Sequence, residues 1–141
     1  MSTFKLKILI SGAGIAGPCL AYWLAKTRFQ TSITIVERAL LPRATSQSID
    51  IHGPAVEIVK KMKVVDSIHS CSTTEEGTQI LNSSGKAIAL FNAGDAFTAE
   101  YEILRTDSSR LFLEATESLS NVQYMYGNSI KSLELTDEIS M

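Results

Sequence analysis

The chain has 141 residues, of which 45% are hydrophobic and 20% are charged. This is the composition of an ordinary globular protein, and the length suits a single domain, so we expect one domain over residues 1–141. The 13 basic and 15 acidic residues leave a net charge of −2 without a basic stripe, which argues against a nucleic-acid partner.

The cysteines and the apolar segments exclude further classes of protein. The two cysteines lie far apart, which fits neither a disulfide framework nor a metal-ligand spacing. No apolar stretch approaches the roughly 18 residues that a membrane span needs. The apolar run near the N-terminus breaks into glycines too early for a signal peptide. We therefore predict a soluble, cytoplasmic protein without a metal site.

The first predicted elements form a β-α-β unit. Residues 5–11 are a compact β-rich run closed by glycine, which is typical of a buried strand in a parallel sheet covered on both faces. The pattern becomes helical over residues 14–26, and residues 32–37 predict a second, β-branched strand. Residues 38–48 look irregular.

Shorter elements are predicted in the middle of the chain. Gly53 and Pro54 indicate a helix start, because proline is tolerated in a first helical turn. A glycine-containing turn between two β-rich runs predicts a hairpin. The predicted elements are a short strand at 49–51, helices at 54–62 and 64–70, hairpin strands at 77–82 and 87–91, and a loop at 93–99.

The last predicted elements are one helix and two strands. Thr106 or Asp107 can cap a helix over residues 108–118. Residues 122–126 predict a strand, and the alternation in residues 130–135 predicts another. The order of elements indicates an α/β fold with a small antiparallel insertion.

The segment between the first predicted strand and the first helix matches the pattern G-x-G-x-x-G. This glycine loop consists of Gly12, Ala13, Gly14, Ile15, Ala16 and Gly17. Gly12 permits a tight turn, Gly14 lets a pyrophosphate approach the backbone, and Gly17 lets the helix pack close to the sheet. Free N–H groups and the positive end of the helix dipole would hold the phosphates. The loop contains no lysine, which argues against a nucleoside-triphosphate loop.

Glu37 ends the second predicted strand, 20 residues after Gly17. A carboxylate there can accept hydrogen bonds from a ribose hydroxyl and would repel a 2′-phosphate, which disfavours NADP at this site. Strand, glycine loop, helix and acidic strand end together predict a Rossmann-like dinucleotide-binding βαβ unit. The alternative is a glycine-rich turn with an unrelated surface glutamate. The βαβ unit by itself does not separate FAD from NAD.

Three segments resemble one protein family. GAGIAGPCLAYWLAK followed by ITIVERA is similar to the N-terminus of the flavin-dependent aromatic hydroxylases, the FAD monooxygenases related to para-hydroxybenzoate hydroxylase. Residues 48–55 (SIDIHGPA), with a helix ending in MKVVD, and residues 102–113 (EILRTDSSRLFL) resemble later segments of that family. The resemblance extends over about residues 5–135 and implies that the cofactor is FAD.

The resemblance also implies contacts of particular residues with FAD. The glycine loop would line the pyrophosphate, Glu37 would hold the adenosine ribose, and Arg38 would lie near the adenine end. Arg105 would reach the FAD from across the cleft. Arg43 falls near a segment where the family often contacts the cofactor, although relatives more often have a pair of glycines there.

Members of this family are usually longer and carry two further FAD motifs, a GADG-type segment and a Gly-Asp segment, which do not occur in this sequence. The expected fold is therefore incomplete relative to the family. The resemblance implies an enzyme that uses NAD(P)H as a transient electron donor and O2 to hydroxylate a small organic substrate, aromatic or polyketide-like. No residue is nominated as catalytic.

Two other interpretations stay open. One is a non-catalytic, truncated remnant that keeps a nucleotide-binding half-site. The other is a small NAD-binding module unrelated to flavin, against which the Arg105 segment argues.

Four further residues are weaker candidates. His52 and His69 have no partner at a metal-ligand spacing. Asp50 would face the flavin region by analogy with the family. Cys19 is expected to pack inside the first helix.

Overall fold

The computed structural model describes residues 6–41, 47–73, 76–92, 95 and 99–134. The chain divides into two compact units, one of residues 1–42 and 112–141 and one of residues 43–111. The elements in chain order are β1 (Leu6–Ser11), α1 (Ala16–Ala25), β2 (Thr31–Glu37), β3 (Ser48–Ile51), α2 (Pro54–Met62), α3 (Val65–Cys71), β4 (Gly77–Leu81), β5 (Ala87–Asn92), β6 (Tyr101–Leu104), α4 (Arg105–Glu117) and β7 (Val122–Tyr126). The fold is mixed α/β, with one parallel sheet and two small antiparallel sheets, as the sequence predicts at that level.

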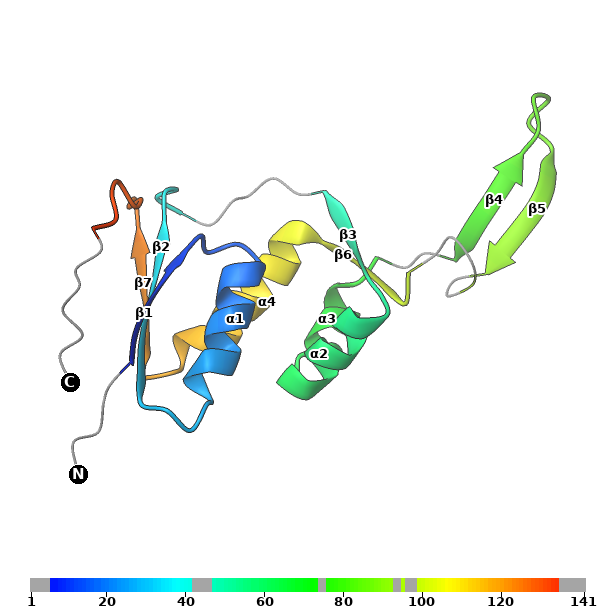
Figure 1. Cartoon of the computed structure of the whole chain (residues 1–141). Helices are drawn as coiled ribbons and strands as arrows, with labels where there is room; N and C mark the ends of the chain where they lie inside the picture. The colour runs from blue at the N-terminus through cyan, green and yellow to red at the C-terminus, as the bar shows by residue number, and fades with distance from the viewer. Residues whose placement is uncertain (1–5, 42–46, 74–75, 93–94, 96–98, 135–141) are drawn as a thin grey trace. The chain divides into compact units, whose positions relative to one another are not determined.

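The first unit is built on a parallel sheet with the strand order β1-β2-β7 (Figure 1). In the register of the sheet, Ile8 lies beside Ile33, and Ile33 lies beside Val122. β1, α1 and β2 follow one another in the chain, and the two strands pair in parallel, so the predicted β-α-β order is confirmed.

The core of the first unit lies between the sheet and α1. Ile33 and Ile35 are almost fully buried, at 1% and 0% exposure, because they are two residues apart on the same face of β2. Ile10 from β1 and Ala21 from α1 complete the buried cluster. Burying a side chain of the size of isoleucine contributes about 1.5–3 kcal/mol, so β2 is the main anchor of this sheet.

The other face of the sheet is open in the first unit, which contradicts the expectation of a strand over residues 5–11 covered on both faces. Leu9, which lies on the face of β1 opposite α1, is 53% exposed, and Leu6 at the start of the strand is 54% exposed. β1 pairs with β2 on one side, and α1 packs on the inner face of the sheet. The apolar pattern of β1 predicts a strand correctly, but it does not show whether one or both faces of the strand are covered by other elements.

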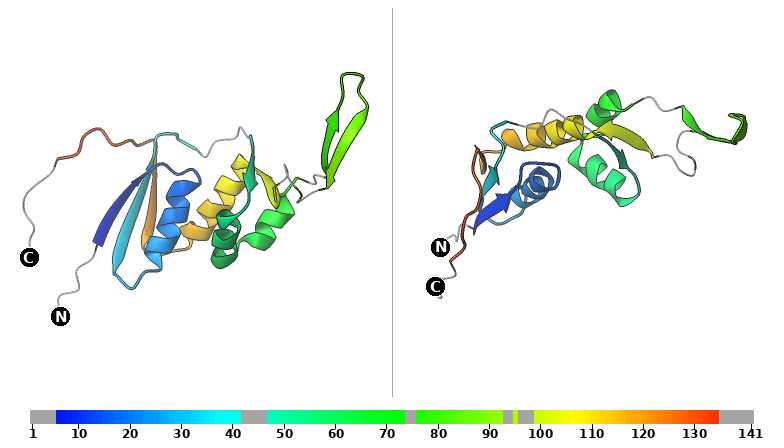
Figure 2. Two further views of the ribbon diagram at one scale, coloured as in Figure 1. Left: turned by 45° about the vertical axis from the view of Figure 1, so that its right-hand side comes forward. Right: turned by 90° about the horizontal axis from the view of Figure 1, so that it is seen from above.

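The second unit contains the antiparallel pair β3–β6, in which Ile49 lies opposite Ile103, and helix α3 contacts β6 (Figure 2). Helix α2 begins at Pro54 as predicted and buries Val56, Val59 and Met62. This spacing of three residues keeps the apolar side chains on one face of the helix.

The hairpin β4–β5 also belongs to the second unit and confirms the hairpin predicted from the sequence. The side-chain oxygen of Asn82 accepts the backbone N–H groups of Ser84 and Lys86, and Gly85 has φ +79°. An asparagine that bonds to its own turn, together with a glycine at positive φ, closes a tight connection.

Two strands and one helix start differ from the sequence prediction. β6 is not predicted, although Ile103 is fully buried. α4 begins at Arg105 directly after β6, so Thr106 and Asp107 lie inside the helix and do not cap it. Residues 130–134 form no strand and are exposed. Alternation of apolar and polar residues indicates which face of a strand is buried. A strand also needs a neighbouring strand for its backbone hydrogen bonds, and this pattern does not supply one. The last predicted strand residue, 135, lies outside the described residues.

Among the helices that the structure describes, none is long and apolar enough to cross a membrane.

Candidate functional site

The glycine loop connects the end of β1 to the start of α1 and is tied to β2. The N–H of Gly12 donates to the carbonyl oxygen of Val36 at 2.7 Å. Gly12 has φ +107°, a backbone conformation that side chains disfavour. The turn out of β1 therefore depends on glycine at position 12.

The other two glycines of the motif differ in what surrounds them. A Cβ atom on Gly17 would lie 2.0 Å from the carbonyl oxygen of Gly12, so the chain itself leaves no room for a side chain there. A Cβ atom on Gly14 would meet nothing within 4 Å. Gly17 thus serves the packing of α1, whereas Gly14 borders open space in which a ligand could approach the backbone.

The start of α1 presents backbone donors next to this open space. The N-cap residue is Ile15, whose side chain has no atom that accepts a hydrogen bond. The first bond of the helix is donated by the N–H of Cys19 to the carbonyl oxygen of Ile15 at 3.1 Å. The first N–H groups of a helix have no partner inside the helix and carry its positive dipole end. An anionic group is the natural ligand of such a helix start.

Glu37 joins the end of β2 to the glycine loop. Its Oε2 atom accepts the N–H of Ala13 at 2.9 Å, and its Oε1 atom accepts the N–H of Ala39 at 3.0 Å. The side chain is half-buried. The structure therefore brings together the glycine loop and the predicted acidic strand end, and it links them directly.

Arg38 and Arg105 are both exposed, and they belong to different units. Arg38 follows β2 directly. Arg105 is the first residue of α4, and its N–H donates to the carbonyl oxygen of Gln47 at 2.9 Å. Arg43 lies outside the described residues.

Two tyrosines of β7 lie beside this site and are not singled out by the sequence. The rings of Tyr124 and Tyr126 are stacked, with centroids 6.1 Å apart. Tyr126 lies next to Glu37 in the sheet register. Burial, together with the negative charges of Glu117 and Glu37, raises the pKa of Tyr126. The repeat of an aromatic residue at every second position of a strand was the available signal.

Tyr124 is held by the fully buried Thr116 of α4. The two hydroxyl oxygens lie 2.6 Å apart, and the Thr116 hydroxyl donates to the carbonyl oxygen of Phe112 at 3.0 Å. Either hydroxyl can be the donor in the bond between Thr116 and Tyr124. Burial raises the pKa of Tyr124, and the bond to Thr116 opposes this rise. The bond anchors the C-terminal half of α4 to the inner face of the sheet.

Of the weaker candidates, Asp50, His52 and His69 belong to the second unit, whereas Cys19 lies in α1. Asp50 is exposed and lies opposite Glu102 in the β3–β6 pair. Hydroxyl groups of Thr73 and then Ser48 lower the pKa of Glu102. Within the described part of the chain, no group of His, Cys, Asp and Glu side chains gathers as it would around a metal ion. Burial raises the pKa of the Cys19 thiol, in keeping with a packing role.

No protein-family model matches the chain. Individual proteins do match it. An FAD-dependent monooxygenase of Sarocladium schorii is 37% identical over 97% of this chain, and a flavin-dependent monooxygenase of a Phoma species is 34% identical over 94%. The chain is homologous to part of the flavin-dependent monooxygenases. It spans 33% and 32% of the length of these two relatives.

A solved structure shares the fold of this chain. The crystal structure of the tetracycline destructase Tet(55) superimposes with a TM-score of 0.74 at 28% identity. The match covers 97% of this chain and 33% of that protein. The predicted resemblance to flavin-dependent monooxygenases is thus confirmed over nearly the whole chain.

Proposed function

We propose that this chain is a Rossmann-like FAD-binding portion of a flavin-dependent monooxygenase, with residues 1–141 acting as one FAD-binding domain. The observation that carries the proposal is the hydrogen bond of 2.9 Å from the N–H of Ala13 to Glu37. This bond links the glycine loop, which has the form of a phosphate-binding loop, to Glu37, which is placed where such folds bind a ribose hydroxyl. A dinucleotide needs both groups at one site, and similarity to an FAD-dependent monooxygenase supports FAD as the dinucleotide.

The glycine loop is proposed to hold the pyrophosphate. The open space at Gly14 supports a close approach of phosphate oxygens to the backbone. The N–H groups from Ala13 to Gly17 and the start of α1 would supply donors and positive charge. Since Ile15 cannot cap the helix with its side chain, a phosphate oxygen would not have to displace a capping group.

Glu37 is proposed to accept a hydroxyl of the adenosine ribose. Each carboxylate oxygen has two lone pairs, so accepting a backbone N–H leaves capacity for a ribose hydroxyl. The same charge would repel a 2′-phosphate, which favours FAD over NADP at this site. Arg38 and Arg105 are proposed to contact the adenine end and the rest of the FAD, respectively, as in the family that the sequence resembles.

We further propose, from the similarity to its relatives, that the whole protein is a monooxygenase that uses NAD(P)H and O2. When bound, the flavin would accept electrons from NAD(P)H and react with O2. The residues described here would bind and orient the cofactor. A small organic substrate, aromatic or polyketide-like, fits the name of the tetracycline destructase with this fold. A cytoplasmic location remains a prediction.

FAD binding can be tested by titrating the chain with FAD and following flavin fluorescence. We expect saturable binding and a flavin absorbance band that remains after desalting. Glu37→Gln should weaken FAD binding about tenfold or more, because a hydrogen bond to a charged group contributes roughly 1.5–3 kcal/mol. The matched control is Glu114→Gln, an exposed glutamate of α4 with the same change of charge.

FMN provides a second control, because it lacks the adenosine that Glu37 is proposed to hold. Glu37→Gln should leave any FMN binding unchanged. Equal loss of FAD and FMN binding would contradict the role of Glu37 at the ribose. Absence of FAD binding by a folded chain would refute the proposed function.

Nucleotide binding without turnover is the second candidate function for the isolated chain. The observation in its favour is that the chain spans a third of its relatives. It predicts the same FAD affinity but no oxidation of NADH or NADPH in the presence of the chain and FAD. Oxidation above the rate of free FAD would exclude it.

A further inference from the structure

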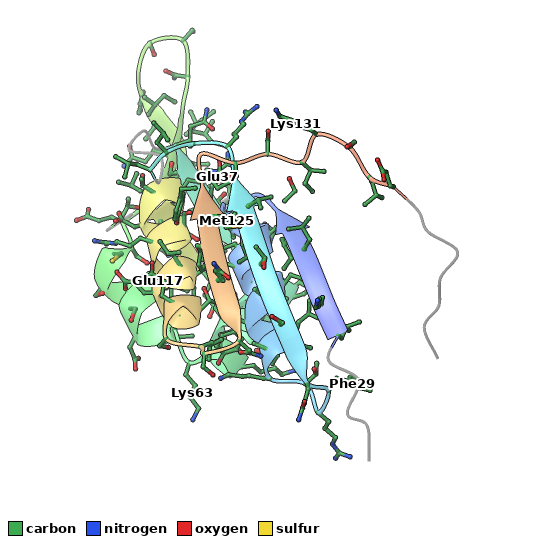
Figure 3. The ribbon with its side chains drawn as sticks, turned by 90° about the vertical axis from the view of Figure 1, so that its left-hand side faces the viewer. Phe29, Glu37, Lys63, Glu117, Met125 and Lys131 are labelled. Atoms are coloured by element: carbon green, nitrogen blue, oxygen red, sulfur yellow. The ribbon has the colours of Figure 1, made fainter. Side chains whose placement is uncertain are left out.

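Tyr126 lies at the carboxyl end of the parallel sheet, and the proposed function gives it no role. It pairs in register with Glu37, and Tyr124 pairs with Ile35 one row earlier. Tyr124 packs against the buried cluster between the sheet and α1, so Tyr126, two residues on, faces the same side. Figure 3 labels Glu37 at this end of the sheet and Met125, the residue before Tyr126, on the neighbouring strand β7. Tyr126 and Glu37 therefore lie side by side, at the edge where open parallel sheets bind ligands.

The glycine loop, Glu37 and Tyr126 follow one another across this edge. β2 lies between β1 and β7 in the sheet. The glycine loop follows β1, and its Ala13 N–H donates to Glu37 at the end of β2. Tyr126 ends β7, on the other side of Glu37. In FAD the pyrophosphate, the ribose and the adenine follow one another in the same order. A ligand held by the loop and by Glu37 would therefore direct its adenine toward Tyr126.

The ring of Tyr126 is held in place by its neighbours in the first unit. It stacks on the ring of Tyr124, with centroids 6.1 Å apart and planes 13° from parallel. The hydroxyl of Tyr124 lies 2.6 Å from that of Thr116. The N–H of Asn128 donates to the carbonyl oxygen of Glu37 at 3.0 Å, which ties the chain after β7 to the end of β2. A fixed aromatic ring loses little side-chain entropy when a base packs against it.

Tyr126 also stays neutral beside the charge of Glu37. Burial, and then the charges of Glu117 and Glu37, raise the pKa of Tyr126. The side chain is half-buried, so part of it is open to a ligand. An aromatic side chain of this kind packs against the face of a nucleobase without reading its hydrogen-bonding pattern.

We propose that Tyr126 is a specificity-determining residue of this site, whose ring packs against the adenine of FAD. The inference rests on the proposed function and adds a contact with the base to the contacts with pyrophosphate and ribose. The glycine loop and Glu37 would recognise groups that every dinucleotide has. Tyr126 would instead favour ligands that carry a large aromatic base at the end that Glu37 holds.

The test compares four ligands in titrations of the parent chain and of Tyr126→Leu. FAD and ADP carry adenine, UDP carries a smaller base on the same ribose and pyrophosphate, and FMN carries no adenosine. Tyr126→Leu should weaken FAD and ADP binding about fivefold or more, because contact between the base and an aromatic ring is lost. The loss should be smaller for UDP, and any FMN binding should be unchanged. Tyr126→Phe keeps the ring and should bind FAD within about twofold of the parent.

The matched control is Tyr101→Leu, the same change at a half-buried tyrosine of β6 in the second unit. It should leave the affinity for FAD and ADP unchanged. Circular dichroism must show that each variant is folded, and Tyr126→Met, which keeps more of the side-chain length, replaces Tyr126→Leu if that protein does not fold.

Three results would overturn the inference while the parent chain still binds FAD. One is an unchanged affinity of folded Tyr126→Leu for FAD and ADP. Another is an equal loss of ADP and UDP binding, which would show that the substitution disturbs Glu37 and not a contact with the base. The third is a loss of FMN binding as large as that of FAD. A folded parent chain that does not bind FAD would instead overturn the proposed function, and this inference with it.

Discussion

Substituting Gly14 and Gly17 separately should distinguish ligand binding from packing, and Gly17→Ala is the decisive change. Its new Cβ would lie 2.0 Å from the carbonyl oxygen of Gly12, 3.2 Å from the carbonyl carbon and 3.4 Å from Cγ2 of Ile10. The obstacle is backbone, so α1 must move away from β1 by more than an ångström. Overpacking of this kind costs about 1–3 kcal/mol, and a backbone obstacle favours the upper end.

Alanine also stabilises a helix by about 1 kcal/mol relative to glycine, which partly offsets this cost. The expected net loss is therefore about 2 kcal/mol in the free energy of unfolding. With a slope of about 2 kcal/mol per molar urea, the midpoint of unfolding should fall by about 1 M. Circular dichroism during urea denaturation measures this shift.

Gly14→Ala is the matched control, because the same added methyl group meets nothing within 4 Å. It should change the stability by less than about 0.5 kcal/mol. If the proposed function is right, it should nevertheless weaken FAD binding about tenfold or more, equal to about 1.4 kcal/mol, because the methyl group occupies the approach of the pyrophosphate. A Gly17→Ala protein as stable as the parent, or a Gly14→Ala protein as unstable as Gly17→Ala, would refute this reasoning.

Three further predictions concern the core and the tyrosines of the first unit. Ile33→Ala should cost about 2–5 kcal/mol in urea denaturation, whereas Ile88→Ala, at 65% exposure, should cost less than about 0.5 kcal/mol. Thr116→Val and Tyr124→Phe should each cost about 1 kcal/mol, and the double variant less than their sum; full additivity would show that the bond is not formed. Because burial raises the pKa of Tyr124, the unfolded chain loses this proton first, at about pH 10. Stability should therefore hold below that pH and fall above it, less steeply in Tyr124→Phe.

Local sequence patterns predict most of the elements that the structure contains. The alternation of β-branched residues in β2, the proline at the start of α2 and the turn of the hairpin are properties of neighbouring residues, and the structure has each of these elements. The spacing predicts that Glu37 lies near the glycine loop, and the Ala13 N–H donates to Glu37 at 2.9 Å.

The errors occur where a distant partner decides the outcome. Residues 130–134 alternate as a strand should, yet they form none, whereas β6 forms at residues without a clear pattern because β3 pairs with it. The sequence predicts the start of α4 three residues too late, because Thr106 or Asp107 can cap a helix, whereas the helix follows β6 directly.

What the order of amino acids determines here is the local chemistry: a tight turn at Gly12, a helix start without a side-chain cap, and a carboxylate at the end of a strand. These depend on backbone conformation and on neighbours in the chain, which short motifs encode. Only the tertiary structure shows what surrounds Gly14 and Gly17. Gly17 is required by the carbonyl of Gly12, and Gly14 borders open space. It also left Leu9 of β1 exposed on the face opposite α1, because burial depends on the elements that pack against a strand and not on the strand's own residues.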